Sequence, residues 1–305
     1  MSGAAADLAG SPFSGLSAFP LTPLRDDGVD EYAFASVVSG LAASGVDSIT
    51  ALVSTGCAAY LTGAERERVG RLSLEHAGSV PVIVGVSALR TSQVLTHVNA
   101  AAGAGAVGML LAPMSYQPLT DREVLELYRT VTEHTDLPVV VYDNPGTTHF
   151  TFRLELYAQI AQLPGIASLK IPPMAPEAAG ERVAAVRAVL PEHVTLGISG
   201  DACAASALLA GCDGWYSVIA GTCPQPALEI MRAAAGPDPQ DALTASERLE
   251  PLWELFADHG SLRVVAAIAE HLGLAPGDCL PQPLLGLGPD QRERTAEAVA
   301  ELGLR

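Results

Sequence analysis

The sequence is poor in positive charge, and lysine is almost absent from it. Among 305 residues, 17 are Lys or Arg and 34 are Asp or Glu, so the formal net charge is −17. A strongly acidic chain repels a phosphate backbone, and we therefore expect no nucleic-acid partner. Sixteen of the 17 basic residues are arginine, which leaves Lys170 as the only lysine in the protein.

Long apolar runs and paired cysteines are also missing. No apolar run approaches the roughly 18–20 residues that a membrane-spanning helix needs, and the first basic residue, Arg25, lies too far along the chain for a secretory signal. The five cysteines form no CxxC pair and are odd in number, which argues against a disulfide framework or a thiolate zinc site. We therefore expect a cytoplasmic protein with no membrane partner.

Short apolar segments alternate with helical patterns along most of the chain. The apolar segments have few polar positions, which is typical of parallel strands buried on both faces. Eight strand-then-helix units within about 200–250 residues predict a closed (β/α)8 TIM barrel, and an open doubly wound sheet is the alternative. The predicted strands are residues 15–21, 48–53, 82–86, 108–112, 138–142, 166–171, 195–199 and 214–218. The predicted helices are residues 30–44, 63–76, 91–103, 121–134, 152–163, 176–190, 201–210 and 224–234.

The two ends of the chain depart from this alternation. Residues 1–11 are mostly Ala, Gly and Ser, and we predict a flexible N-terminal tail there. The barrel domain is predicted to occupy residues 12–237, because a segment rich in Pro and Gly follows it. Residues 238–305 form a predicted C-terminal helical region, with helices at residues 241–257, 261–272 and 289–302.

Capping side chains support several of the predicted helix starts. Thr120 and Glu123 have the spacing of a capping box, in which each side chain accepts a hydrogen bond from the other residue's backbone N–H. Asp30 and Asp201 precede helical patterns in the way that N-cap residues do. We therefore expect helices to begin directly after these positions.

Lys170 lies in an apolar segment, where a surface lysine is out of place. It is either a chance remnant of a composition biased against lysine or a residue that the chemistry of the protein requires. Apolar surroundings lower the pKa of an amine, and the neutral amine is its nucleophilic form. We therefore take Lys170 as a candidate nucleophile.

Tyr142 ends the predicted strand that precedes the Lys170 strand. The carboxyl ends of barrel strands carry the active site, and neighbouring strands lie about 4.8 Å apart. A phenol beside an amine at this end can transfer protons while the amine adds to a carbonyl group. The alternative is an aromatic ring that only covers the core.

Polar loops follow two other predicted strands. Ser54-Thr55-Gly56 can present hydroxyl and backbone N–H donors to a carboxylate, or it can be an ordinary polar turn. The same two interpretations apply to Ser199-Gly200-Asp201. Both loops are therefore candidate parts of a site at the carboxyl end of the barrel.

Motifs for other chemistries are absent or misplaced. The segment of residues 103–108 matches G-x-G-x-x-G, but it follows a helix and opens a strand, so it predicts a helix C-cap rather than a dinucleotide site. The seven histidines show no H-x-H or H-E-x-x-H spacing, and we expect neither a metal nor an organic cofactor. Cys57 is a weaker candidate nucleophile, because no histidine lies near it in the sequence.

Together these motifs resemble the dihydrodipicolinate synthase and N-acetylneuraminate lyase family of Schiff-base lyases and aldolases. The resemblance extends from about residue 12 to residue 302, and its motifs follow one another at matching spacing. It implies a (β/α)8 barrel with C-terminal helices that assembles as a homo-oligomer, either a tetramer or a dimer. The motifs are Phe19-Pro-Leu-Thr-Pro23, Ser54-Thr55-Gly56, Tyr142-Asp-Asn-Pro145, Lys170, Ser199-Gly200-Asp201-Ala202 and Gly214-Trp-Tyr-Ser-Val218.

The resemblance also implies roles for single residues. Lys170 matches the lysine that forms an imine with a 2-oxo acid, commonly pyruvate, and Tyr142 matches the tyrosine that carries protons. Ser54 and Thr55 match the residues that hold the substrate carboxylate. The substrate pocket implied in this way is further lined by Gly56, Gly200 and Tyr216.

The chain departs from the family's usual motifs at three places. Val53 and Cys57 stand where the family has a glycine and a glutamate around the hydroxyl pair. Ser115 stands where the synthase has a tyrosine that reaches the neighbouring subunit's site, and Tyr116, one place later, is the candidate substitute. Thr147 stands where the synthase has the arginine that recognises the carboxylate of aspartate semialdehyde. Losing that charge-assisted contact disfavours the synthase reaction itself.

We therefore predict a lyase or aldolase that makes or breaks a carbon–carbon bond of a 2-oxo acid through an imine on Lys170. Three alternatives stay open. The chain can be a true 4-hydroxy-tetrahydrodipicolinate synthase, a dehydratase that acts on a sugar-derived oxo acid, or a non-catalytic sensor or scaffold that binds an oxo acid.

Overall fold

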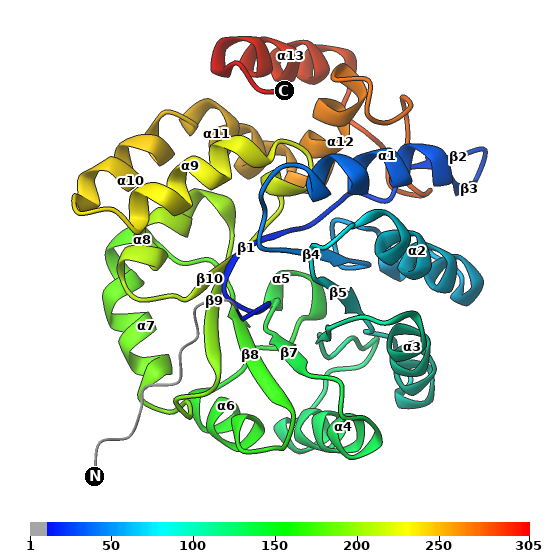
Figure 1. Ribbon diagram of the computed structural model, residues 1–305, viewed down its shortest axis with the longest axis vertical. Coiled ribbons are helices and arrows are strands. Elements are labelled where there is room, and N and C mark those ends of the chain that lie inside the picture. Colours follow the sequence, from blue (N-terminus) through cyan, green and yellow to red (C-terminus); the bar gives the residue numbers. More distant parts are fainter. Residues whose placement is uncertain (1–10) are drawn as a thin grey trace.

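The computed structural model describes residues 11–305. The predicted N-terminal tail covers residues 1–11, so all but its last residue lies outside the described part of the chain. In Figure 1, strands surround a central axis and helices form a ring outside them. No helix in the described part is long and apolar enough to span a membrane.

Eight parallel strands close into a barrel in which β1 pairs with both β10 and β4. This closure confirms the predicted (β/α)8 barrel and excludes the open doubly wound sheet. Several predicted strands are a few residues too long, as at residues 15–21, where the strand already ends at Ala18. The strands are β1 (Gly15–Ala18), β4 (Ser48–Ala51), β5 (Val82–Gly85), β6 (Gly108–Leu111), β7 (Val139–Tyr142), β8 (Ile166–Ile171), β9 (Thr195–Ser199) and β10 (Gly214–Ser217).

A helix follows each barrel strand. The capping box of Thr120 and Glu123 is present, Asp30 accepts a hydrogen bond from the backbone of Ala33, and Gly105 ends its helix in the left-handed conformation. The helices of the ring are α1 (Glu31–Ala42), α2 (Gly63–His76), α3 (Thr91–Ala104), α4 (Asp121–His134), α6 (Leu154–Ala161), α7 (Ala179–Arg187), α8 (Ala204–Leu209) and α9 (Pro224–Ala234).

Several short elements were not predicted. A hairpin of β2 (Leu24–Arg25) and β3 (Gly28–Val29) follows β1, and the one-turn helix α5 (Pro145–Thr148) follows β7. The 3₁₀ turns η1 (Ala58–Tyr60) and η4 (Ile219–Gly221) lie in loops of the barrel. Two others directly precede α7 and α8, within residues that were predicted to be helical: η2 (Pro176–Ala178) and η3 (Asp201–Cys203).

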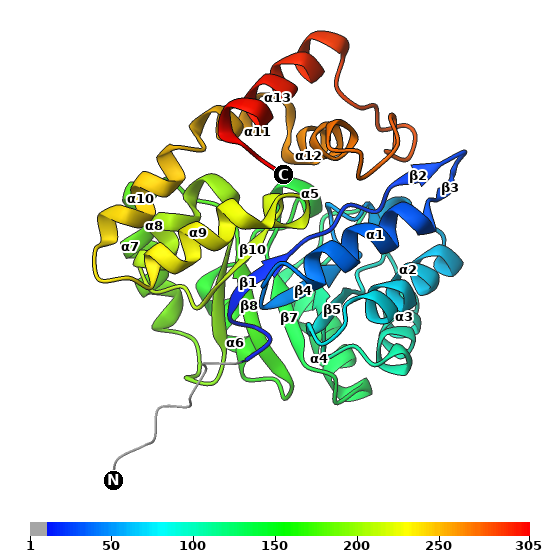
Figure 2. The same cartoon turned by 45° about the horizontal axis from the view of Figure 1, so that its top comes forward.

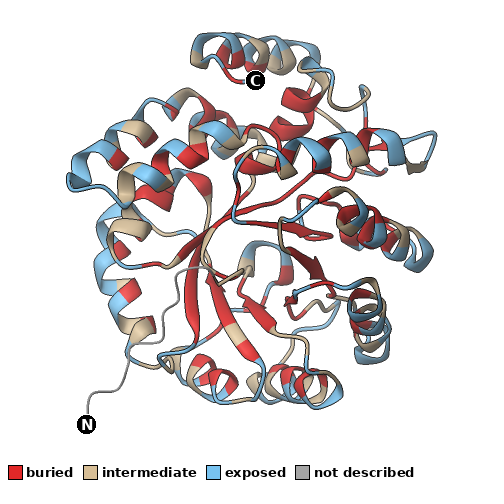
Figure 3. Cartoon of the chain, viewed as in Figure 1, coloured by how far each residue is buried: buried red, intermediate tan, exposed pale blue. Residues whose placement is uncertain are grey.

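Side chains of the strands alternate between two cores. Ile83 and Val140 belong to the cluster that fills the barrel, whereas the next residues, Val84 and Val141, pack outward in the cluster beneath the helices. Figure 3 shows the result, with buried strands at the centre and exposed residues on the outer faces of the helices. The position of a residue along a strand therefore decides whether its side chain enters the barrel.

Four further helices follow the ring: α10 (Pro239–Glu247), α11 (Glu250–His259), α12 (Ser261–His271) and α13 (Pro289–Leu302). The prediction of one helix over residues 241–257 was wrong, because Pro251 lacks an N–H and a new helix begins beside it. In Figure 2, α12 and α13 lie over one end of the barrel. Leu21 and Cys57, from loops after β1 and β4, pack there with Ala266 of α12.

Candidate active site

Strand alternation turns Lys170 toward the barrel axis. On β8, Leu169 and Ile171 pack in the core beneath the helices, so the side chains of Ser168 and Lys170 face the interior. The Lys170 residue is only 2% exposed. The one lysine of the chain is therefore among its most buried large side chains.

Aromatic rings surround the Lys170 amine. Its Nζ atom lies 3.9 Å from the ring centroid of Tyr142, 4.1 Å from that of Phe19 and 5.8 Å from that of Tyr216. Burial lowers the pKa of Lys170 well below its ordinary value of 10.5, and the negative charge of Asp201 opposes this shift only in part. These surroundings favour the neutral, nucleophilic form of the amine.

Tyr142 lies beside Lys170 because the two residues are partners in the β7–β8 register. Burial raises the pKa of the Tyr142 phenol, and hydrogen bonds with Ser54 and Ser199 offset part of that increase. The phenol is therefore protonated at neutral pH and lies where it can donate a proton to a group bound at Lys170.

Asn144 joins two of the candidate residues, and sequence reasoning missed it. Its side-chain amide donates to the phenol oxygen of Tyr142 at 2.8 Å and to the hydroxyl oxygen of Ser54 at 3.3 Å. The available signal was a polar residue two positions after Tyr142, since residues i and i+2 of an extended chain share a face.

The loop after β4 forms a tight turn around Ser54, Thr55 and Gly56. Ser54 is exposed, whereas Thr55 is buried. A Cβ atom at Gly56 would lie 3.2 Å from the backbone nitrogen of Leu52, so the turn leaves little room for a larger residue. Cys57 ends the turn in the left-handed region, with φ of 52°. Burial raises the pKa of its thiol to about 12, which speaks against Cys57 as a nucleophile.

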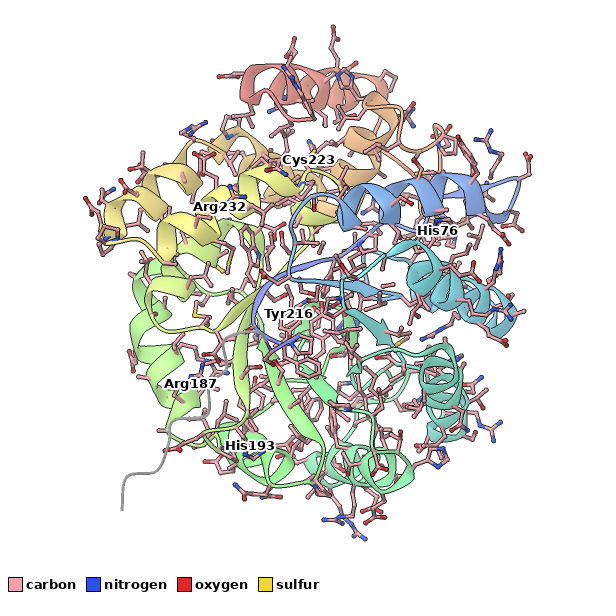
Figure 4. All side chains as sticks on the ribbon, viewed as in Figure 1. His76, Arg187, His193, Tyr216, Cys223 and Arg232 are labelled. Atoms are coloured by element: carbon pink, nitrogen blue, oxygen red, sulfur yellow. The ribbon has the colours of Figure 1, made fainter. Side chains whose placement is uncertain are left out.

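Gly200 and Tyr216 lie close to the Lys170 strand. Gly200 has φ of +87°, and a Cβ atom there would lie 2.5 Å from the Cβ of Pro173, so only glycine fits. The hydroxyl of Tyr216 is 2.9 Å from the hydroxyl of Ser168, and its ring lies at the barrel centre in Figure 4. The Tyr216 hydroxyl therefore already has a partner inside the protein.

Two predicted site residues lie outside the buried cluster. Thr147 is exposed on α5, where its hydroxyl donates to the backbone oxygen of Asn144 at 3.4 Å. Tyr116 is 91% exposed in the loop after β6, so its ring stands in solvent. Neither is among the rings and hydroxyls around the Lys170 amine.

The prediction of Asp201 as a helix N-cap was wrong. The helix after it begins at Ala204, and the Asp201 carboxylate accepts hydrogen bonds from the indole N–H of Trp215 at 3.0 Å and the backbone N–H of Ile219 at 2.8 Å. Trp215 follows Asp201 by 14 residues, a separation that local patterns do not reveal. The buried carboxylate therefore fixes the loop after β10 and contributes a negative charge near Lys170.

No group of three or more His, Cys, Asp or Glu side chains that could hold a metal ion occurs among residues 11–305. The candidate site consists instead of an amine, a phenol, an amide and hydroxyl groups. Fold and site together define the class, a (β/α)8-barrel protein with a buried amine and a phenol at the centre of the barrel.

The chain belongs to the dihydrodipicolinate synthetase family, whose model matches residues 12–302. It is 33% identical over 288 residues to 4-hydroxy-tetrahydrodipicolinate synthase of Methylococcus capsulatus, a match that covers 93% of this chain and 96% of the relative. The crystal structure of dihydrodipicolinate synthase from Agrobacterium tumefaciens is similar with a TM-score of 0.92 and 40% identity, covering 96% of this chain and 99% of that one. The crystal structure of the chloride-inhibited dihydrodipicolinate synthase from Acinetobacter baumannii, in complex with pyruvate, is similar with a TM-score of 0.86 and 25% identity. The match covers 96% of this chain and 100% of that one.

Proposed function

We propose that the chain makes or breaks a carbon–carbon bond of a 2-oxo acid of the pyruvate type, through an imine on Lys170. The observation that carries this proposal is the buried amine of the only lysine, 3.9 Å from the ring centroid of Tyr142. The pyruvate complex of the Acinetobacter relative supports the choice of substrate class.

The proposed reaction begins when the neutral Lys170 amine attacks the keto carbon. The Tyr142 phenol protonates the carbinolamine hydroxyl, which leaves as water and yields an iminium ion and a phenolate. The iminium ion then acts as an electron sink for the bond on the adjacent carbon. In the direction of synthesis, the phenolate removes a proton from that carbon, and the resulting enamine attacks an aldehyde.

The remaining site residues serve to bind the substrate in this proposal. Ser54, Thr55 and Gly56 receive the carboxylate at the turn after β4. Gly200 and the ring of Tyr216 shape the pocket around the keto group. Thr147 and Tyr116 stay predictions for contacts with the second substrate or with a neighbouring subunit.

We also propose the compartment, the oligomeric state and the domain organisation of the protein. Five cysteines are free and buried, which supports a reducing, cytoplasmic compartment. A solved relative described as the first monomeric dihydrodipicolinate synthase variant implies that these synthases are otherwise oligomeric, which supports a homo-oligomer, a dimer or a tetramer. We also propose that the catalytic domain is formed by residues 12–237 and that a C-terminal helical region is formed by residues 238–305.

Borohydride reduction in the presence of pyruvate tests the proposed imine. We expect a stable adduct on the peptide that contains Lys170, and its position is unambiguous because the chain has no other lysine. Lys170→Met is the control, since it fills a similar space without a primary amine. If a panel of 2-oxo acids leaves no adduct on Lys170, the proposal is wrong. A separate assay with pyruvate and aspartate semialdehyde distinguishes the synthase reaction from other aldol reactions.

A further inference from the structure

The side chain of Asn144 does not cap the helix that follows it. Asn144 is the N-cap residue of α5, and asparagine is among the residues that most often cap a helix through their side chains. Its side chain makes no such capping hydrogen bond. Both hydrogen bonds of its amide nitrogen go instead to Tyr142 and Ser54, at 2.8 and 3.3 Å.

The backbone of Asn144 is firmly held. Its carbonyl oxygen accepts hydrogen bonds from the N–H groups of Thr147 and Thr148, each at 3.0 Å, and from the Thr148 hydroxyl, also at 3.0 Å. The ring of Pro145 fixes the next φ angle, and the Thr148 side chain is buried. The start of α5 therefore fixes the backbone from which the Asn144 side chain projects.

The amide nitrogen can only donate, and this decides the state of the phenol oxygen. Tyr142 must accept at its oxygen, so its own proton is free to point toward Ser54, Ser199 or a bound ligand. A donor to the phenol oxygen stabilises the phenolate more than the phenol. Asn144 thus acts against burial, which disfavours the charged form of Tyr142.

We propose that Asn144 is a positioning residue that orients the Tyr142 phenol and stabilises its phenolate during proton transfer. The inference rests on the proposed imine chemistry and deepens it. When the phenol gives its proton to the leaving hydroxyl, water and phenolate form, and the amide holds the phenolate until it takes a proton from the carbon next to the iminium group. Asn144 itself gains and loses no proton.

A titration that needs no substrate tests the inference directly. The protein is labelled with 3-fluorotyrosine, and Tyr142→Phe identifies the ¹⁹F resonance of position 142. In Asn144→Leu, which removes both donors without adding charge, we expect this resonance to titrate about one to two pH units higher than in the parent protein. Asn144→Asp removes the donors and adds a negative charge, so its shift should be larger.

The matched control is Asn99→Asp, at the only other asparagine in the chain. Asn99 is exposed on α3 and contacts His134 at 2.8 Å. The Asn99→Asp variant should leave the resonance of position 142 unchanged. Equal titrations of that resonance in Asn144→Leu and the parent protein would overturn the inference, whatever substrate the enzyme uses.

Exchange of the pyruvate methyl protons in D₂O gives a second measurement. In Asn144→Leu we expect kcat for exchange to fall about 10- to 100-fold with KM changed less, because the lost interaction is strongest when the phenol is charged. A rise in KM alone would show a merely structural role and contradict the inference. If the parent protein shows neither exchange nor a borohydride adduct, the proposed function fails, and the ¹⁹F titration still decides the role of Asn144.

Discussion

At the residue scale, the reactivity of this site depends on the buried, aromatic environment of one amine, that of Lys170. Sequence reasoning identified Lys170 and Tyr142 and predicted that they lie on neighbouring strands, because strand alternation and barrel topology are regular. It could not show that the ring of Phe19 lies 4.1 Å from the amine, since Phe19 is far from Lys170 in the sequence. Nor could it show the contact of Asn144 with the phenol, which depends on the path of the chain after Tyr142.

Lys170→Met should stabilise the folded protein. The folded protein lowers the pKa of Lys170 below 10.5, so between the lowered pKa and 10.5 the unfolded chain binds a proton that the folded protein does not. Stability of the parent protein therefore rises with pH across that window. Chemical denaturation should show that Lys170→Met gains about 1–2 kcal/mol near neutral pH, and that the gain shrinks as pH approaches 10.5. If this variant were less stable than the parent protein at neutral pH, the claim that burial of the Lys170 amine costs folding free energy would be contradicted.

Tyr142→Phe should separate proton transfer from binding. Removing the phenol hydroxyl should lower the rate of pyruvate methyl exchange by about 10²- to 10⁴-fold, the usual contribution of a general acid–base group. Tyr32→Phe, on α1 and 85% exposed, is the matched control and should exchange at the parent rate. An unchanged rate in Tyr142→Phe would assign the proton transfer to another group.

At the element scale, the turn after β4 is held in place by close contact with the neighbouring strand, β5. A Cβ atom at Gly85, the last residue of β5, would lie 1.9 Å from the backbone oxygen of Leu52. The guanidinium of Arg66 donates to the backbone oxygen of the same glycine at 2.9 Å. The position of Ser54 and Thr55 therefore depends on the absence of a side chain at Gly85.

Gly85→Ala should displace that turn. We expect it to lower the free energy of unfolding by about 1–3 kcal/mol, the usual cost of overpacking, and to raise KM for pyruvate, because the turn would receive its carboxylate. Gly40→Ala makes the same change in α1, where nothing lies within 4 Å of the added Cβ, and should stabilise the protein by about 0.5–1 kcal/mol. Denaturation curves of both variants test the contrast, and equal effects would disprove it.

The elements that sequence reasoning predicted least well are those set by loops. Helical patterns were enough for α2, and for α4 the capping box of Thr120 and Glu123 added to them; the predicted ends of both helices match the structure. The one-turn helix α5 has no periodicity of its own, because four residues are too few to show one. The carboxylate of Asp201 was misassigned because its partners, Trp215 and the loop at Ile219, are contacts made only in the folded chain.

At the scale of the whole molecule, the low polarity around Lys170 is a property of the closed barrel. Phe19, Tyr142 and Tyr216 come from three separate parts of the chain, and their rings meet around the amine only when β1, β7 and β10 occupy the same barrel. Unfolding would return the amine to water and its pKa to the ordinary value. The eight predicted strand–helix units implied this closure, whereas the rings that line it required the structure.

An NMR titration of the lysine side chain measures that property directly. The protein is labelled with ¹³C at Cε of lysine, and a single resonance results because Lys170 is the only lysine. In the folded protein this resonance should titrate well below pH 10.5, and in concentrated urea it should return to that value. A folded-state titration at the ordinary pKa of lysine would show that the amine is charged at neutral pH, and the proposed chemistry of the site would then be wrong.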